Sequence, residues 1–212
     1  MTRAKDPWSS MTHMIGAVIF SIGTGFLVFW GLLQQVDAIL ITAAAIFGFS
    51  LVALYSAIAT YHYINSTPKV NLLLRKLDHS MIYVLIAGSY TPVLLCYYPP
   101  KEQLWMSIAI WAIAFCGIAV KLLWFNAPRW LYTGFYLFMG WFVLIDLKPI
   151  ASMPVGALIL LAGGGLSYTA GGLIYGLKKP NISPNFGFHE LFHVFVLLGS
   201  ILHYCMVLLY IL

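Results

Sequence analysis

The sequence predicts an all-α membrane protein, a bundle of seven transmembrane helices with the N-terminus in the cytoplasm and the C-terminus outside. Three observations predict this fold: an apolar composition, seven apolar runs, and cationic residues concentrated on one side of those runs. Of the 212 residues, 62% are hydrophobic and 8% are charged, whereas a soluble domain carries about 25% charged residues. Because so little charge could not cover a water-facing surface, lipid is the expected solvent for most of this protein.

The seven runs approach or reach the roughly 20 residues that a helix needs to cross a bilayer. They lie near 13–34, 39–63, 79–98, 104–124, 130–147, 154–176 and 189–211. The segments between them are short and contain proline, glycine, asparagine or charged residues, which are typical of turns. Residues 1–212 are therefore predicted to form a single membrane domain. The first run is long enough to span and follows a polar start, so we expect it to remain in the membrane rather than act as a cleaved signal peptide.

The cationic residues test the helix count and set the orientation. With seven crossings, nine of the eleven lysines and arginines fall on the N-terminal side of the membrane: Arg3, Lys5, Lys69, Arg75, Lys76, Lys121, Arg129, Lys178 and Lys179. Only Lys101 and Lys148 fall on the other side. Since cytoplasmic loops carry the excess of positive charge, the N-terminus is predicted to lie in the cytoplasm, and the protein in the plasma (inner) membrane. A wrong helix count would scramble this skew.

The composition also argues against two other kinds of protein. The net charge of +5 comes from a few cations between apolar runs, so it predicts contact with membrane lipids rather than with nucleic acid. Cys96, Cys116 and Cys205 lie far apart inside apolar runs. Their spacing matches neither a disulfide framework nor a cysteine metal motif.

Five of the six histidines are predicted to gather at one membrane level. In the predicted topology His62 lies near the cytoplasmic end of the second helix, Asp78 and His79 open the third, and His189 and His193 open the seventh; His13 opens the first helix on the same side. Ionisable residues inside a membrane are costly unless they are paired or bind a metal. This level is therefore the candidate functional site.

The spacing of two of these histidines suggests zinc. His189 and His193 are four residues apart and so lie on one helix face, roughly 6 Å apart along its axis. Zinc accepts imidazole nitrogens, and a catalytic site commonly has three protein ligands and a water. We expect His62 to be the third ligand and Asp78 to hold the water or act as general base. His203 lies about 15 Å further along the helix, too far for the same ion, and is expected to be a packing or hydrogen-bonding residue.

A competing interpretation starts from the segment His189-Glu190-Leu191-Phe192-His193, which matches the H-E-x-x-H motif of zinc proteases. In that reading Glu190 is the general base of an intramembrane metalloprotease. Such an enzyme needs a distant aspartate ligand, and the sequence offers no clear segment for one. Glu190 is otherwise expected to be an interfacial carboxylate near Lys178 and Lys179.

Three segments, taken together, resemble the bacterial hemolysin III family of the progestin and adiponectin receptor (PAQR) superfamily. They are Tyr61-His62, the run Lys76-Leu77-Asp78-His79-Ser80 followed by residues 87–92 (AGSYTP), and Phe188 to His193. The resemblance covers nearly the whole chain. It implies zinc held by His62, His189 and His193, with Asp78 beside the water. It also implies a site for lipid amides, because adiponectin receptors and alkaline ceramidases share this architecture.

One position departs from the family pattern, which has serine four residues before the histidine of the second helix. Ile58 stands there in this chain, and the nearest hydroxyls belong to Ser56 and Thr60. Our candidates for supporting the ligands through hydrogen bonds are Ser56, Thr60, His79, Ser80 and Glu190. The family often has glutamine at the position of Glu190, which argues against Glu190 as an obligate base.

Three functions follow as hypotheses. The first is a zinc-dependent hydrolase acting on a lipid amide or ester, with a role in membrane homeostasis. The second is a membrane sensor or receptor with structural zinc, which Ile58 favours. The third is the cytolysin that the family's historical name suggests, although the helices are typical of a resident bundle.

Overall fold

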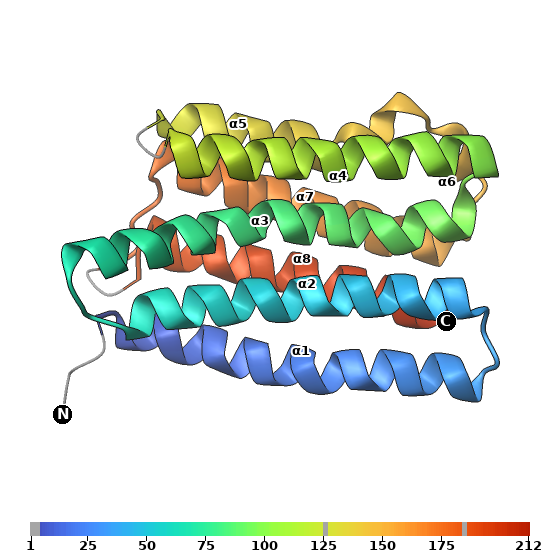
Figure 1. Ribbon diagram of the computed structural model, residues 1–212, viewed down its shortest axis with the longest axis horizontal. Coiled ribbons are helices and arrows are strands. Elements are labelled where there is room, and N and C mark those ends of the chain that lie inside the picture. The colour runs from blue at the N-terminus through green and yellow to red at the C-terminus, as the bar shows by residue number, and fades with distance from the viewer. Residues whose placement is uncertain (1–4, 125–126, 184–185) are drawn as a thin grey trace.

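The computed structural model describes residues 5–124, 127–183 and 186–212, so Arg3 and Asn126 lie outside the described part. All regular elements in that part are helices. They are α1 (Pro7–Leu33), α2 (Ala38–Tyr63), α3 (Pro68–Tyr97), α4 (Pro100–Leu123), α5 (Arg129–Gly140), η1 (Phe142–Ile145), α6 (Lys148–Ala151), α7 (Val155–Leu177) and α8 (Phe188–Tyr210). Figure 1 shows the long helices aligned along one axis, with the start of α1 and the end of α8 at opposite ends of the bundle.

Within the described residues, six helices are long and apolar enough to cross a membrane: α1, α2, α3, α4, α7 and α8. Their outer faces carry exposed apolar side chains such as Ile22, Leu123 and Val155, each at least 70% exposed. In water such faces would be unfavourable, but lipid chains solvate them at no cost. The prediction of an all-helical membrane protein is therefore confirmed, with six candidate membrane-spanning helices among the described residues.

The run 130–147, predicted to be one helix, is divided instead into α5 and η1, and the short helix α6 follows it. At the break, the Tyr90 hydroxyl of α3 donates to the carbonyl of Gly140 at 2.7 Å and accepts from the Val143 N–H at 2.9 Å. One side chain thus satisfies two backbone groups that a continuous helix would have paired internally. Irregular backbone is tolerated at membrane depth where protein groups satisfy it in this way.

The third helix begins eleven residues earlier than the predicted start at position 79. Pro68 occupies its first turn, where a missing N–H costs nothing, and the hydroxyl of Thr67 accepts a hydrogen bond from the Val70 N–H at 3.4 Å. Capping and proline chemistry therefore extend α3 through a segment whose charges suggested a loop.

The packing brings distant segments together around α8. This helix packs mainly on α7 and also meets α1, α2 and α3, while α5 packs on α7 and meets α3 and α4. The N-terminal end of α8 consequently lies beside the C-terminal end of α2. That arrangement places residues more than 120 positions apart in the chain at one end of the bundle.

Candidate metal centre and cavity

Three histidines meet where α8 begins and α2 ends. The Nε2 atoms of His193 and His189 are 3.1 Å apart, and those of His189 and His62 are 3.5 Å apart. One ring nitrogen from each of the three lies within 4.8 Å of the other two. His62 and His193 are buried and His189 is partly buried. We call these residues the histidine cluster.

The spacing of the cluster fits a small ion with tetrahedral preferences. Two nitrogens bound to one zinc at about 2.0–2.1 Å in tetrahedral directions lie roughly 3.3 Å apart, close to the two observed separations. Without an ion between them, three imidazole nitrogens at these distances would point their lone pairs at one another wherever no ring proton lies between two of them. The donor set and its geometry are therefore compatible with a bound metal.

His62 has a second partner that the sequence reasoning missed. Its Nδ1 lies 3.0 Å from Oδ2 of Asp6, and the Asp6 N–H donates to the His62 carbonyl at 2.9 Å. Asp6 precedes the first turn of α1. Its position at the same end of the predicted topology as His62 was the available signal, but nothing in the spacing indicated that the two would touch.

Asp78 lies outside the close cluster but in the same cavity as its three members. Its side chain is 15% exposed, and Oδ2 lies 3.7 Å from Nδ1 of the neighbouring His79. The cavity thus has one carboxylate of α3 in its lining together with the three histidines of α2 and α8. The role of Asp78 beside a metal-bound water stays a prediction.

His79 and Glu190 also line this cavity. Each forms a hydrogen bond with a backbone group about one helical turn earlier in the chain. His79 Nδ1 donates to the Arg75 carbonyl at 2.7 Å. The Oε2 atom of Glu190 accepts from the Gly187 N–H at 2.8 Å, which caps the start of α8.

The other supporting residues named from the sequence lie away from the cavity. Ser56 is exposed, and the Thr60 hydroxyl donates to the Ser56 carbonyl at 2.7 Å. The Ser80 hydroxyl is buried and donates to the Lys76 carbonyl at 2.8 Å. The structure does not bring these hydroxyls to the histidine cluster. By contrast, Ile58 is buried and lines the cavity.

His13 packs against the cluster without joining it. Its ring meets that of His193 edge-on, with centroids 4.2 Å apart, and its Nδ1 donates to the Ser9 carbonyl at 2.7 Å. This hydrogen bond to the backbone fixes the orientation of the His13 ring beside His193.

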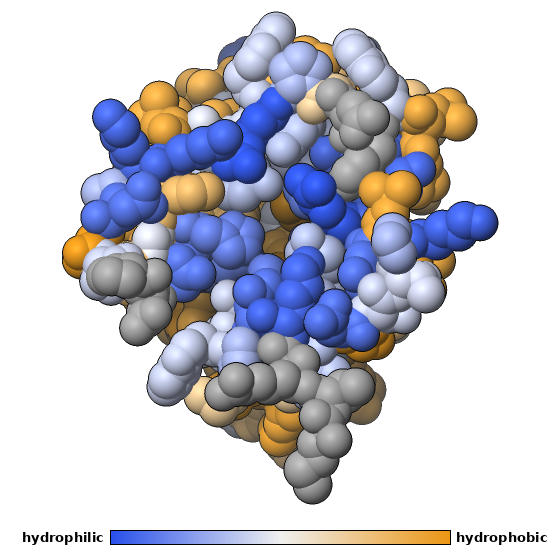
Figure 2. All heavy atoms as spheres, turned by 90° about the vertical axis from the view of Figure 1, so that its left-hand side faces the viewer, coloured by the Kyte–Doolittle hydropathy of each residue, from blue (hydrophilic) through white to orange (hydrophobic). Residues whose placement is uncertain are grey.

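The histidine cluster lies at one end of a cavity of about 650 Å³. Six charged residues contribute to its lining, and most of the rest of the wall is apolar, as represented by Ile86, Val93, Leu144, Leu158 and Leu161. Figure 2 shows hydrophilic side chains gathered over this end of the bundle, with hydrophobic residues around its rim. A cavity of this kind suits a molecule with a polar group and a long apolar tail.

Fold and site together define a class, a multi-pass helical membrane protein with three convergent histidines at the polar end of an apolar cavity. The chain belongs to the family described as "Haemolysin-III related", which it matches over residues 1–204. It is 35% identical over 205 residues to the Hemolysin-3 homolog of Bacillus subtilis (strain 168), with 95% of this chain and 92% of that protein covered. It is 32% identical over 205 residues to Hemolysin-3 of Bacillus cereus, with 96% and 90% covered. The protein is thus a multi-pass protein of the bacterial plasma membrane.

Proposed function

We propose that this protein is a zinc-dependent membrane hydrolase that cleaves an amide or ester bond of a lipid. The observation that carries the proposal is the convergence of His62, His189 and His193 at one end of a largely apolar cavity. The ligands and the space for an acyl chain lie together, so that a carbonyl group could reach the metal while its tail stays in the cavity.

The donor atoms favour zinc over other common ions. Calcium and magnesium prefer oxygen ligands, whereas imidazole nitrogen suits zinc and some other transition metals. His62, His189 and His193 would hold the zinc, which would supply a Lewis acid and activate a water molecule.

The protein's own residues would complete the chemistry. Asp78 lines the cavity beside His79 and is proposed to take the proton from the attacking water and to pass it to the leaving group. The apolar wall would exclude bulk water and hold the acyl chain. Hydrolysis then breaks the bond from the carbonyl carbon to nitrogen or oxygen, and water supplies a hydroxyl to one product and a proton to the other.

We infer that the chain crosses the membrane seven times, with α5, η1 and α6 together forming the fifth crossing. The start of α1 and the end of α8 lie at opposite ends of the bundle, and this requires an odd number of crossings between them (Figure 1). The excess of cations on the N-terminal side supports a cytoplasmic N-terminus. Under this topology the histidine cluster would face the cytoplasmic leaflet.

The test is a comparison of metal content and lipid turnover in the purified full chain. We expect about one zinc per chain by elemental analysis, and hydrolysis products from bilayer lipids that disappear after chelation and return when zinc is added back. A chain that binds no metal would refute the zinc site. A zinc-loaded chain that changes no amide- or ester-linked lipid would refute the hydrolase.

A second candidate is a sensor or receptor in which zinc is structural, and Ile58 is the observation that favours it. This buried apolar side chain lines the cavity where the family pattern has a hydroxyl. A cell phenotype that persists in Asp78→Asn, with zinc still bound, would support the sensor over the hydrolase.

Two further alternatives have less support. For a metalloprotease, Glu190 would have to act as the base, yet its carboxylate accepts the Gly187 N–H at the helix start. A cytolysin is suggested by the relatives' name, Hemolysin-3. Lysis of red cells by the purified protein that does not depend on His62, His189 or His193 would favour that alternative.

A further inference from the structure

We propose that Asp6 is a positioning residue, which orients His62 for the metal and sets its tautomer. This inference rests on the proposed zinc site. It concerns a residue at the start of α1 that belongs to neither of the helices contributing ligands.

Two contacts join Asp6 to His62. The Asp6 carboxylate lies 3.0 Å from Nδ1, and its backbone N–H donates to the carbonyl of His62 at 2.9 Å. Side chain and backbone of one histidine are thus held by one residue. Because a carboxylate can only accept, Nδ1 carries the ring proton, and Nε2 presents its lone pair toward His189. Metal-bound histidines commonly have a carboxylate in this position, and it both fixes the ring and strengthens its basicity.

The side chain of Asp6 does not form the helix-capping hydrogen bond that its position would suggest. Aspartate at the residue before a helix usually accepts a hydrogen bond from a backbone N–H of the first turn. Asp6 occupies that position in α1, yet it makes no side-chain cap. Its carboxylate is directed to His62 instead, at the expense of the usual capping bond.

Neighbouring residues hold the start of α1 against the end of α2. The Ser10 hydroxyl donates to the Ala59 carbonyl at 3.2 Å, and the Lys5 ammonium lies 3.9 Å from the centre of the Tyr61 ring. The final turn of a helix leaves carbonyls without partners, and here the Asp6 N–H supplies a donor to one of them, the carbonyl of His62, while Ser10 bonds to the carbonyl of Ala59 just before that turn. The contact between Asp6 and His62 is therefore supported by the contacts of Lys5 and Ser10, which lie on either side of Asp6 in the chain.

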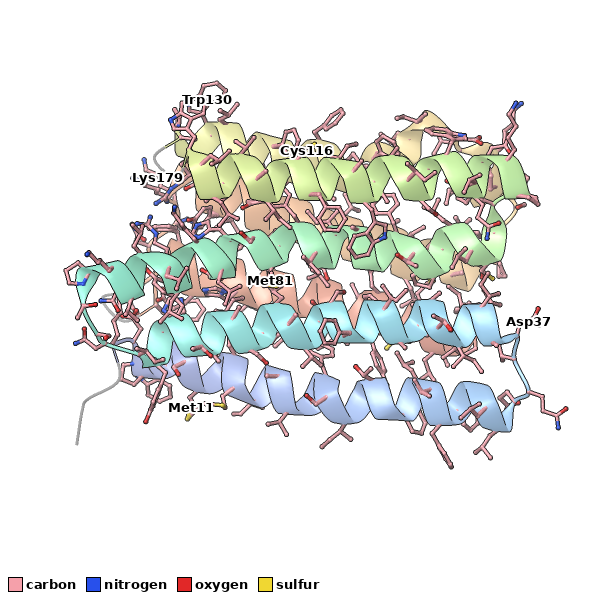
Figure 3. All side chains as sticks on the ribbon, viewed as in Figure 1. Met11, Asp37, Met81, Cys116, Trp130 and Lys179 are labelled. Carbon is pink, nitrogen blue, oxygen red and sulfur yellow. The ribbon has the colours of Figure 1, made fainter. Side chains whose placement is uncertain are left out.

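The chain offers a matched control in Asp37. This residue stands in the same position before α2, also makes no side-chain cap, and lies at the opposite end of the bundle (Figure 3). Removing either carboxylate changes the net charge equally and leaves the helix caps equally unaffected. Only Asp6 touches a residue of the histidine cluster.

The experiment titrates Co²⁺ and Zn²⁺ into purified full-length protein in detergent, using wild type, Asp6→Ala, Asp6→Asn and Asp37→Ala. Affinity comes from competition with a chelator, and the Co²⁺ absorption spectrum reports the ligand set. We expect Asp6→Ala to weaken zinc binding by about 10-fold, at the lower end of the 10–100-fold range for such partners because Asp6 is half-exposed. Asp6→Asn should lose less, since its amide oxygen can still accept from Nδ1, and Asp37→Ala should match wild type.

The outcomes separate this inference from the proposed function. If wild type binds neither metal, the zinc site itself is refuted. If wild type binds zinc and Asp6→Ala binds it equally well, the positioning role is refuted while the site stands. Melting temperatures of the metal-free proteins provide the other check: if Asp6→Ala melts lower than Asp37→Ala without a change in affinity or Co²⁺ spectrum, Asp6 is a structural anchor only, and the inference is overturned.

Discussion

The histidines of α8 have different surroundings at the two places where they occur on this helix. At the start of α8, His189 and His193 turn their Nε2 atoms toward His62. Further along, the Nε2 of His203 donates to the Leu161 carbonyl at 3.2 Å, and its ring meets that of Tyr168 edge-on at 5.4 Å. Both sites line one cavity.

Beside His203, the hydroxyls of Tyr55, Tyr168 and Ser200 are linked by hydrogen bonds, while the buried Nδ1 of His203 has no hydrogen-bond partner among the described residues. The Ser200 hydroxyl donates to the Val196 carbonyl at 2.9 Å and accepts from Tyr55 at 3.1 Å, and the Tyr168 hydroxyl lies 2.9 Å from it. We call Tyr55, Tyr168, Ser200 and His203 the tyrosine network. Whether a buried histidine is a candidate ligand therefore depends on what its nitrogens face: other imidazole nitrogens in the cluster, and a backbone carbonyl in the network.

The largest expected effect tests that difference directly. His193→Ala should lose near-stoichiometric zinc and all chelator-sensitive turnover, because two imidazoles are left for an ion that needs three. His203→Gln should keep the zinc of wild type, since the network contributes no ligand. Elemental analysis of the folded fraction checks both, and equal zinc loss in the two variants would end the distinction between the sites.

Within the histidine end of the cavity, Asp78 separates metal binding from proton transfer. Asp78→Asn should retain zinc but lower turnover by about 10²–10⁴-fold, the usual contribution of a general base. Glu190→Gln is the matched carboxylate-to-amide control and should leave turnover close to that of wild type. A larger loss in Glu190→Gln than in Asp78→Asn would favour the protease interpretation.

The network end should respond in stability rather than in metal content. A Cβ atom added at Gly164 would overlap the His203 ring, whereas Gly165 faces open space. We expect Gly164→Ala to lower the free energy of unfolding by about 1–3 kcal/mol, as overpacking typically does, and Gly165→Ala to cause no loss. Thermal unfolding in detergent, with zinc content measured in parallel, checks this; a drop in zinc per folded chain would show that the two sites are coupled.

The smallest effect is expected at the edge of the network. Tyr55→Phe removes the hydroxyl that donates to Ser200 but keeps the ring packed on Phe20, whose centroid is 4.9 Å away. Hydrogen bonds between membrane helices contribute about 0.6–1.7 kcal/mol, so the melting temperature should fall slightly. Tyr63→Phe, at an exposed position, serves as the control; an equal shift in both variants would mean that the buried hydroxyl contributes nothing specific.

The long apolar runs and the common level of the histidines could be predicted from the sequence. Hydropathy fixes which segments can lie in lipid, and the direction of each helix then decides at which end His62, His189 and His193 emerge. The ends of the helices were harder to predict from the sequence. At the start of α3, the capping hydroxyl of Thr67 and the first-turn proline Pro68 outweighed the local charges.

Other features depended on partners far away in the chain. The run 130–147 is broken where a hydroxyl from α3 replaces backbone hydrogen bonds, and no local pattern around Gly140 reveals Tyr90 as the donor. Ser56 and Thr60 are close to His62 in sequence but not on the face of α2 that meets the cavity. Asp6 looked like part of a polar start until α1 was seen against the end of α2.

By itself the sequence determined a helical protein for a lipid environment, with five of its six imidazoles at one end, because hydrophobicity and helix direction are properties of each segment. Tertiary structure alone decided that three Nε2 atoms converge, that Asp6 holds one of those rings, and that His203 bonds to a backbone carbonyl instead. The physical reason is that coordination and hydrogen bonding act over about 3 Å, and only helix packing sets such distances between residues remote in the chain.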